Sequence, residues 1–283
     1  GWTSIDAALA VEGGLKTISF GDSGSSVYPW IYGVKLDGKL LVDQGVSVAP
    51  VPSIANTGAS VGTKQGFSIV KYTGNSTAGA TVAHGLSQTP DFVVLKQING
   101  TNESWRVRHA HSGDLTKTLY LNGDAANSTN TEYISDASST TITLSNGASG
   151  INSDSDYIVY SWHDVPGLQK FGKYTGNNDS DAADGPFVEL GFRPGLVAIK
   201  RSNGTGNWVV YDNKRDIDNV TSRRIVPSSA AAEQTSQTID MLSNGFKPRS
   251  TGGNINTDNN TYIYYAIAEA PFVSSKGVPT TAR

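Results

Sequence analysis

The strongest constraint on the fold is an internal repeat of about a hundred residues. The segment Lys-Tyr-Thr-Gly-Asn occurs at 71–75 and again, unchanged, at 173–177. Further segments recur in the same order, 102 to 105 positions apart: 90–96 with 194–200, 105–107 with 208–210, and 157–160 with 262–265. This period is too long for a solenoid or a propeller blade. It indicates one complete small domain duplicated in tandem, which suits a chain of 283 residues.

Within each copy, short runs rich in β-branched and aromatic residues alternate with clusters of Gly, Asn, Ser and Asp. In the first copy the runs are 67–72, 81–84, 92–98, 105–109, 118–121, 140–144 and 157–162. Seven or eight short strands are typical of a β-sandwich or jelly roll. The sequence therefore predicts an all-β fold of tandem, jelly-roll-like β-sandwich domains. Only 228–234 has a composition that suggests one or two turns of helix.

The residues before the repeat have a different pattern. Ile31 to Asp43 alternates as strand, turn and strand around Asp37-Gly38, a favourable hairpin turn. The stretch that follows is rich in Pro, Ser, Gly and Ala, which indicates a linker. We therefore expect the closing strands of an upstream β domain, a linker, two repeats and a tail, at 1–50, 51–65, 66–166, 167–273 and 274–283. Because the only methionine is Met241, we also expect Gly1 to lie inside a longer polypeptide.

Composition excludes several classes of protein. The formal net charge is −3, and no block of Lys and Arg offers the positive surface that a nucleic acid requires. There is no cysteine, which excludes disulfides, thiol nucleophiles and thiolate metal sites. The longest apolar runs, such as Phe92 to Leu95, fall far below the roughly 20 residues that span a bilayer. We expect neither nucleic-acid binding nor membrane insertion.

The segment His109-Ala110-His111 is a candidate metal site, because residues i and i+2 of a strand face the same side. Asp114 lies close in sequence and offers a third ligand. The second copy has Asp212 in place of His109, so the pair is not part of the common scaffold. The alternative is a strand end that faces solvent without a ligand, and this is the simpler interpretation.

Two acidic, amide-rich loops offer oxygen ligands that suit Ca²⁺. The first, at 177–185, contains Asp179, Asp181 and Asp184, and the second lies at 152–156. Neither has the spacing of an EF-hand loop. Solvated loops are the alternative, and we expect no other cofactor.

Several aromatic residues are candidates for packing or for sugar binding. Trp105 and Trp208 occupy equivalent positions of the two copies, which indicates packing residues. Trp30, Tyr133 and Trp162 are free of that constraint and are candidates for stacking on a sugar ring.

No catalytic constellation is recognisable in the sequence. The Gly-x-Ser-x-Gly elbow and its strand-turn-helix context are missing. Cleavage of a glycosidic bond requires two carboxylates across that bond, and 25 acidic residues leave this alternative open without supporting it. We therefore expect a protein that is not an enzyme.

The repeat motifs also resemble a known group of proteins. The order GFSIVKYTGN, HGLSQTPDFVVLK, YIVYSWHDVPG, LQKFGKYTGN, DGPFVELGFRPGLVAIKR, NWVVYD, LSNGFKPR and AEAPF is similar to a domain pair in tail-fibre-like structural proteins of aquatic tailed bacteriophages. The likeness covers about residues 64–273, and LDGKLLVDQGV resembles the end of a lectin-like sandwich that precedes such pairs.

This resemblance implies a virion structural protein, a tail-fibre or adhesin segment that attaches to the host. It further implies assembly as a homotrimer, contact with other tail proteins, and a glycan or protein of the host surface as receptor. Two alternatives are a capsular polysaccharide depolymerase or esterase of a tail spike, and a bacterial surface carbohydrate-binding module.

Overall fold

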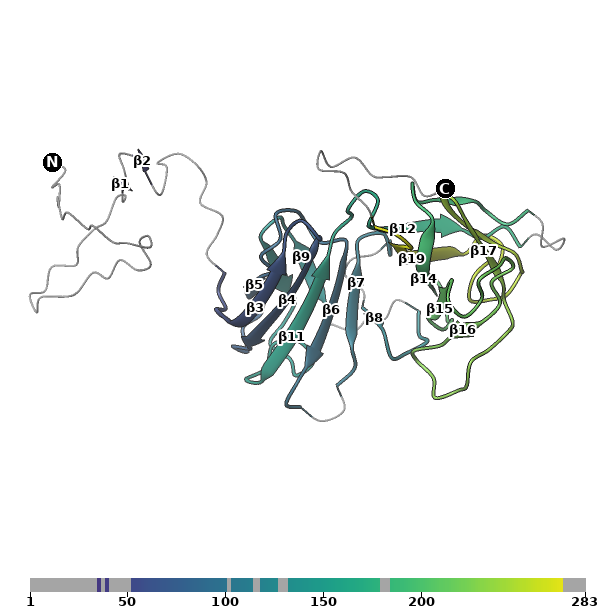
Figure 1. Cartoon of the computed structure of the whole chain (residues 1–283). Helices are drawn as coiled ribbons and strands as arrows, with labels where there is room; N and C mark the ends of the chain where they lie inside the picture. Colours follow the sequence, from purple (N-terminus) through teal and green to yellow (C-terminus); the bar gives the residue numbers. More distant parts are fainter. Residues whose placement is uncertain are drawn as a thin grey trace, which may run out of the picture. The chain divides into compact units, whose positions relative to one another are not determined.

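A computed structural model describes residues 52–100, 103–113, 118–126, 132–178 and 184–271, and the backbone of 35–36 and 39–40 (Figure 1). The chain divides into two compact units, 1–49 and 50–283. In the first unit, β1 (Lys35–Leu36) pairs antiparallel with β2 (Lys39–Leu40), as the hairpin pattern predicts. Trp30 and the rest of this unit lie outside the described residues.

The first repeat is a sandwich of two antiparallel sheets. Its larger sheet has the order β3-β4-β11-β6-β7-β8, and its smaller sheet the order β5-β10-β9. The bounds of the strands are β3 (Asn56–Gly62), β4 (Phe67–Thr73), β5 (Thr81–Ala83), β6 (Phe92–Gln97), β7 (Arg106–His109), β8 (Leu119–Tyr120), β9 (Ile134–Ala137), β10 (Thr141–Leu144) and β11 (Asp156–Trp162).

The second repeat has the same topology with one strand fewer. Its sheets have the orders β12-β19-β14-β15-β16 and β13-β18-β17, which match those of the first repeat strand for strand once β3 is removed. The bounds are β12 (Gln169–Thr175), β13 (Val188–Glu189), β14 (Pro194–Arg201), β15 (Val209–Asp212), β16 (Arg224–Ile225), β17 (Ile239–Leu242), β18 (Gly245–Pro248) and β19 (Thr261–Ala268). The described residues form strands and no helix, which confirms the all-β class.

Two local predictions are wrong. The expected linker at 51–65 contains β3, which pairs with β4 from Gly62↔Phe67 to Asn56↔Tyr72. The side chains of this edge strand are almost all exposed, so it has no apolar pattern, and its backbone hydrogen bonds alone define it. The expected helical turn at 228–234 is irregular chain, which returns to the sheet where Gln234 bridges to Arg224.

Within the described residues no helix has the length and apolar character for crossing a membrane.

Each sandwich has its own core, built from one face of each sheet. In β11 buried and half-buried side chains alternate along the whole strand, as expected when one face packs inward. A pair of stacked tyrosines lies in each core. Tyr72 stacks on Tyr157 with ring centroids 5.0 Å apart, and Tyr174 stacks on Tyr262 at 5.2 Å. The stacked pair is therefore a feature that both copies retain.

The recurring Lys-Tyr-Thr-Gly-Asn motif anchors a loop in each copy. In the second copy the Tyr174 hydroxyl donates to the Ile255 carbonyl at 2.6 Å, and the backbone N–H of Asn177 donates to Asn256 Oδ1 at 3.0 Å. The first copy makes the same two contacts, from Tyr72 to Ile151 and from Asn75 to Asn152. Between the two anchors, Gly176 lies so close to the carbonyl oxygen of Thr257 that a Cβ atom would overlap it.

We predict that Gly176→Ala lowers the free energy of unfolding by about 2 kcal/mol, because the added methyl group forces backbone apart. Gly253→Ala is the matched control. It lies in the loop that the motif anchors, and its Cβ would be 3.9 Å from the nearest atom. Urea denaturation of both variants measures the difference, and equal stability of the two would contradict this account of the motif.

Candidate functional site

The outward faces of the two larger sheets pack against each other. Their shared cluster contains Phe92, Val94, Val107 and Leu119 from the first repeat and Phe171, Trp208 and Ile263 from the second. Alternate residues of β6 take part in different clusters. Val93 and Leu95 face the core of the first sandwich, whereas Phe92 and Val94 face the second repeat. For this reason nearly every side chain of β6 is buried.

Phe92 lies at the centre of this inter-repeat interface. Its ring stacks on Phe171 with centroids 5.8 Å apart and meets the edge of Trp208 at 6.2 Å. Half-buried side chains, including Trp105 and Tyr265, pack around the cluster. Large aromatic contacts surrounded by partly exposed neighbours are typical of strong protein–protein interfaces.

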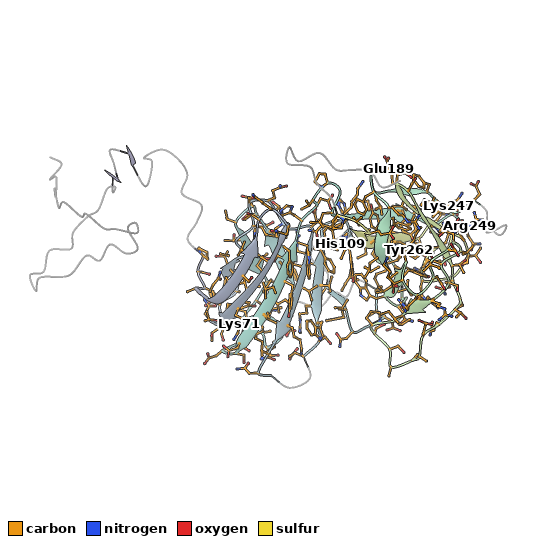
Figure 2. The ribbon with its side chains drawn as sticks, viewed as in Figure 1. Lys71, His109, Glu189, Lys247, Arg249 and Tyr262 are labelled. Carbon is orange, nitrogen blue, oxygen red and sulfur yellow. The ribbon has the colours of Figure 1, made fainter. Side chains whose placement is uncertain are left out.

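His109 lies between the two sandwiches and is fully buried (Figure 2). Its Nε2 lies 3.0 Å from the Tyr264 carbonyl, and its Nδ1 lies 3.2 Å from the backbone nitrogen of His111. These partners assign the neutral tautomer, with the proton on Nε2. Burial is the main reason that the pKa of His109 is lowered to about 3, and the nearby His111 and Arg108 lower it further.

The proposed His109–His111 metal site is therefore not supported. Both ring nitrogens of His109 already have hydrogen-bond partners within the chain, so neither has a free lone pair for a cation. Asp114, the expected third ligand, lies outside the described residues. Among the described residues no group of three His, Asp or Glu side chains is placed to hold a metal ion.

Lys200 fixes a loop of the first repeat to the second repeat. Its side chain is fully buried, and Nζ donates to the carbonyls of Asp124, Ala125 and Arg201 at 3.3, 2.9 and 2.8 Å. Burial lowers the pKa of Lys200 to about 8, although the Asp124 carboxylate acts in the opposite direction. The Trp208 indole adds a 2.9 Å hydrogen bond to the Tyr120 carbonyl. The buried polar groups of Lys200 and Trp208 thus both donate to backbone carbonyls of the first repeat.

Two of the three predicted sugar-binding aromatics, Tyr133 and Trp162, lie among the described residues. Trp162 stacks on Phe67 at 4.8 Å and on Tyr160 at 6.1 Å, and it packs half-buried against the inter-repeat cluster. Tyr133 is half-buried, and its backbone nitrogen donates to Ser145 Oγ. Of the two equivalent tryptophans, Trp208 is buried as predicted, although in the interface, and Trp105 is half-buried at its edge.

Of the three aspartates in the predicted calcium loop, only Asp184 is among the described residues. Its side chain is exposed and pairs with Lys247 at 3.4 Å, and its carbonyl accepts from Asn177 Nδ2. Asp179 and Asp181 lie outside the described residues. In the other acidic loop, Asn152 is buried and belongs to the anchor of the repeated motif.

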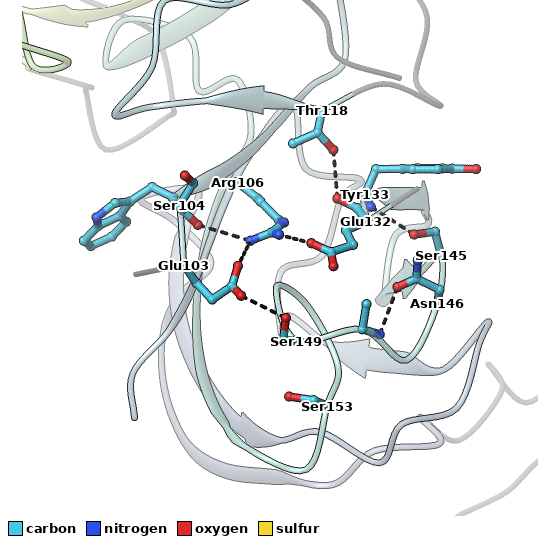
Figure 3. A network of polar contacts seen from close by, with 12 residues as sticks. Glu103, Ser104, Arg106, Thr118, Glu132, Tyr133, Ser145, Asn146, Ser149 and Ser153 are labelled. Carbon is cyan, nitrogen blue, oxygen red and sulfur yellow. Dashed lines mark hydrogen bonds and ion pairs between the residues drawn. The ribbon is translucent and has the colours of Figure 1, made fainter. Parts of the chain in front are cut away.

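A buried arginine distinguishes the first repeat from the second. Arg106 lies in β7 opposite Leu95, so its side chain enters the sandwich, where the second copy has Val209. Its guanidinium pairs with Glu103 at 3.0 Å and with Glu132 (Figure 3). Ser149 Oγ donates to the other oxygen of Glu103. Because both carboxylates pair with Arg106, this network connects the loops that contain Glu103 and Glu132.

A small hollow lies at the junction between the repeats. Its volume is about 270 Å³, and it is lined by Asp164, Pro166, Gln169, Lys170, Leu190 and Phe192. The Gln169 amide donates to the carbonyls of Gln65, Gly66 and His163 and so supports the junction from inside. Burial raises the pKa of the Asp164 carboxyl group, against a hydrogen bond from the Phe171 amide. Sequence patterns gave no sign of this hollow, because its residues come from separate segments.

We predict that His109 makes the protein less stable in acid. Its folded-state pKa of about 3 lies below the ordinary value of 6.5, so between these values the unfolded chain binds a proton that the folded chain does not. The free energy of unfolding therefore falls as the pH falls through this window, by up to ~1.4 kcal/mol per pH unit. In His109→Gln, whose amide can still donate to Tyr264, chemical denaturation from pH 7 to pH 4 should show a shallower slope. Parallel profiles for the two proteins would refute the assignment.

Lys200 should give the stability the same dependence on pH as His109, but in the alkaline range. The unfolded chain keeps the lysine proton up to about pH 10.5, whereas the folded chain releases it near 8. The contribution of Lys200 to stability therefore rises with pH between these values. Denaturation of wild type and Lys200→Met should give a stability difference that shifts in favour of wild type as the pH rises from 8 to 10. A difference that does not vary with pH would contradict this prediction.

Comparison with known proteins identifies the family to which this chain belongs. No curated protein and no solved structure gives a significant match. One family model, described as a domain of unknown function (DUF7483), matches residues 43–271. The match includes both sandwiches, the interface between them and the β3 strand that precedes the repeat. The chain therefore belongs to the DUF7483 family.

Proposed function

We propose that this chain is a structural and adhesive segment of a bacteriophage tail fibre, which assembles with copies of itself and with other tail proteins. Its receptor would be a glycan or protein of the host surface. The observation that supports this proposal is the inter-repeat interface, centred on Phe92 and closed by His109 and Lys200. This interface joins two sandwiches that could otherwise move about a six-residue connection between β11 and β12.

A rigid pair of domains suits a protein that must transmit force and present loops at fixed spacing. Aromatic packing supplies the apolar contact, and the Trp208–Tyr120 and His109–Tyr264 hydrogen bonds fix the register of the two faces. Breaking such a contact would expose buried apolar surface and leave buried polar groups without partners.

The exposed surface supports weak and multiple contacts. Charged residues make up only 17% of the chain, and the loops are rich in Asn, Ser, Thr and Gly. Such side chains offer adaptable hydrogen bonds, and repeated copies on one particle convert weak contacts into firm attachment.

The enzymatic alternative, a depolymerase or esterase, receives less support. A catalytic base at His109 would need a free ring nitrogen, and both of its ring nitrogens have partners within the chain. The Glu103 and Glu132 carboxylates pair with Arg106. Asp164, which lines the hollow, accepts a backbone hydrogen bond from Phe171, and Asp91 accepts one from the backbone of Asp164.

The proposal predicts that antibodies raised against the purified chain label the tail of the phage that encodes it. Immunogold electron microscopy of purified particles measures this. The same chain, added in excess to host cells, should lower the adsorption rate of that phage at least several-fold, since it occupies the receptor. Unlabelled particles, with unchanged adsorption, would refute the proposal.

A further inference from the structure

The hollow at the junction lies beside a glycine of the second repeat whose surroundings differ from those of its equivalent in the first repeat. Gly85 and Gly191 hold equivalent positions, two residues after β5 and after β13, with φ of 75° and 80°. In the first repeat, Val61 of β3 covers this place, because a Cβ on Gly85 would lie 2.7 Å from its Cγ2 atom. A Cβ on Gly191 would have no atom within 4 Å. Among the described residues the second repeat has no strand equivalent to β3, and none of them fills the space beside Gly191.

The size of the hollow limits what it can hold. Its volume of about 270 Å³ is slightly below the roughly 300–1,000 Å³ of pockets for drug-sized ligands. Leu190 and Phe192 form an apolar floor and are themselves only 5% and 4% exposed. A single small ring fits these dimensions, whereas an oligosaccharide would extend beyond them.

The rim offers hydrogen-bond partners of both kinds. Asp164 uses Oδ1 to accept from the Phe171 amide at 2.7 Å, and Oδ2 has no partner among the described residues. Lys170 donates one N–H from Nζ to the Glu189 carbonyl at 3.0 Å and keeps two further N–H groups. An acceptor and two donors therefore stand beside an apolar floor.

We propose that this hollow binds one neutral pyranose ring of a host-surface glycan. Its C–H face packs on Leu190 and Phe192, one hydroxyl group donates to Asp164, and a neighbouring oxygen accepts from Lys170. A sugar ring carries donors and acceptors around its edge and an apolar face, which matches this arrangement. An anion would meet the Asp164 carboxylate, and a purely apolar ligand would leave that carboxylate desolvated without a partner.

This inference rests on the proposed function, for which it names the ligand class and the place of contact. The test is saturation-transfer NMR on the full chain with methyl glycosides of glucose, galactose, mannose, rhamnose and N-acetylglucosamine at millimolar concentration. Asp164→Asn keeps an acceptor for the Phe171 amide but loses the charge, and Lys170→Met loses the donor. Asp154→Asn and Lys173→Met are matched controls, because both side chains are exposed and lie outside the hollow.

We expect saturation transfer to at least one glycoside in the wild type and in both controls. Its dissociation constant should rise at least tenfold in Asp164→Asn and in Lys170→Met. Absence of transfer to every glycoside in the wild type would overturn the inference, and so would a dissociation constant in the two hollow variants that equals that of the wild type.

The adsorption assay separates this inference from the proposed function. If the wild type and Asp164→Asn compete equally well with phage for host cells, the fibre function stands and the sugar site is wrong. If glycoside binding depends on Asp164 but antibodies do not label virions, the sugar site stands and the tail-fibre assignment is wrong.

Discussion

The packing of Phe92 and its neighbours between the two larger sheets is the contact on which the other features of this protein depend. It turns two sandwiches with separate cores into one body with a third apolar cluster. His109 and Lys200 are tolerated inside it because each finds backbone carbonyls as partners. Burial of a polar group is unfavourable without such partners. The interface is thus apolar in its centre and specified by hydrogen bonds at defined positions.

The two copies use equivalent faces for this contact but different residues. Trp208 is buried in the interface and bonded to the first repeat, whereas its equivalent Trp105 remains at the edge. His109 has Asp212 as its equivalent in the second copy. The contact is therefore heterologous rather than self-complementary. After duplication the copies retained the tyrosine pair and the anchored loop, which each sandwich requires, and diverged where they meet.

The candidate site could not be predicted from local sequence patterns, for a physical reason. A pair of histidines, an acidic loop and isolated tryptophans are chemically suggestive, but their availability depends on what packs against them. His109 is buried against a strand 155 residues away in sequence, and Trp162 stacks on two neighbouring aromatic rings. The hollow, in contrast, combines Asp164 from the connection between the repeats with Leu190 from the connection between β13 and β14. The spacing of these two residues in the sequence does not predict that they lie close together.

The sequence by itself determined the all-β class, the tandem duplication, the hairpin around Asp37-Gly38 and the position of all seven strands predicted in the first copy. These follow from alternation, from turn residues and from repetition, which are local. Only the tertiary structure decided that β3 and β9 are strands, because β3 has no apolar face and β9 is short and partly exposed. It also decided that the outer faces are buried and that a hollow remains where the second copy lacks β3. Those outcomes depend on which surfaces pack against each other. That packing is determined jointly by residues that lie far apart in the sequence.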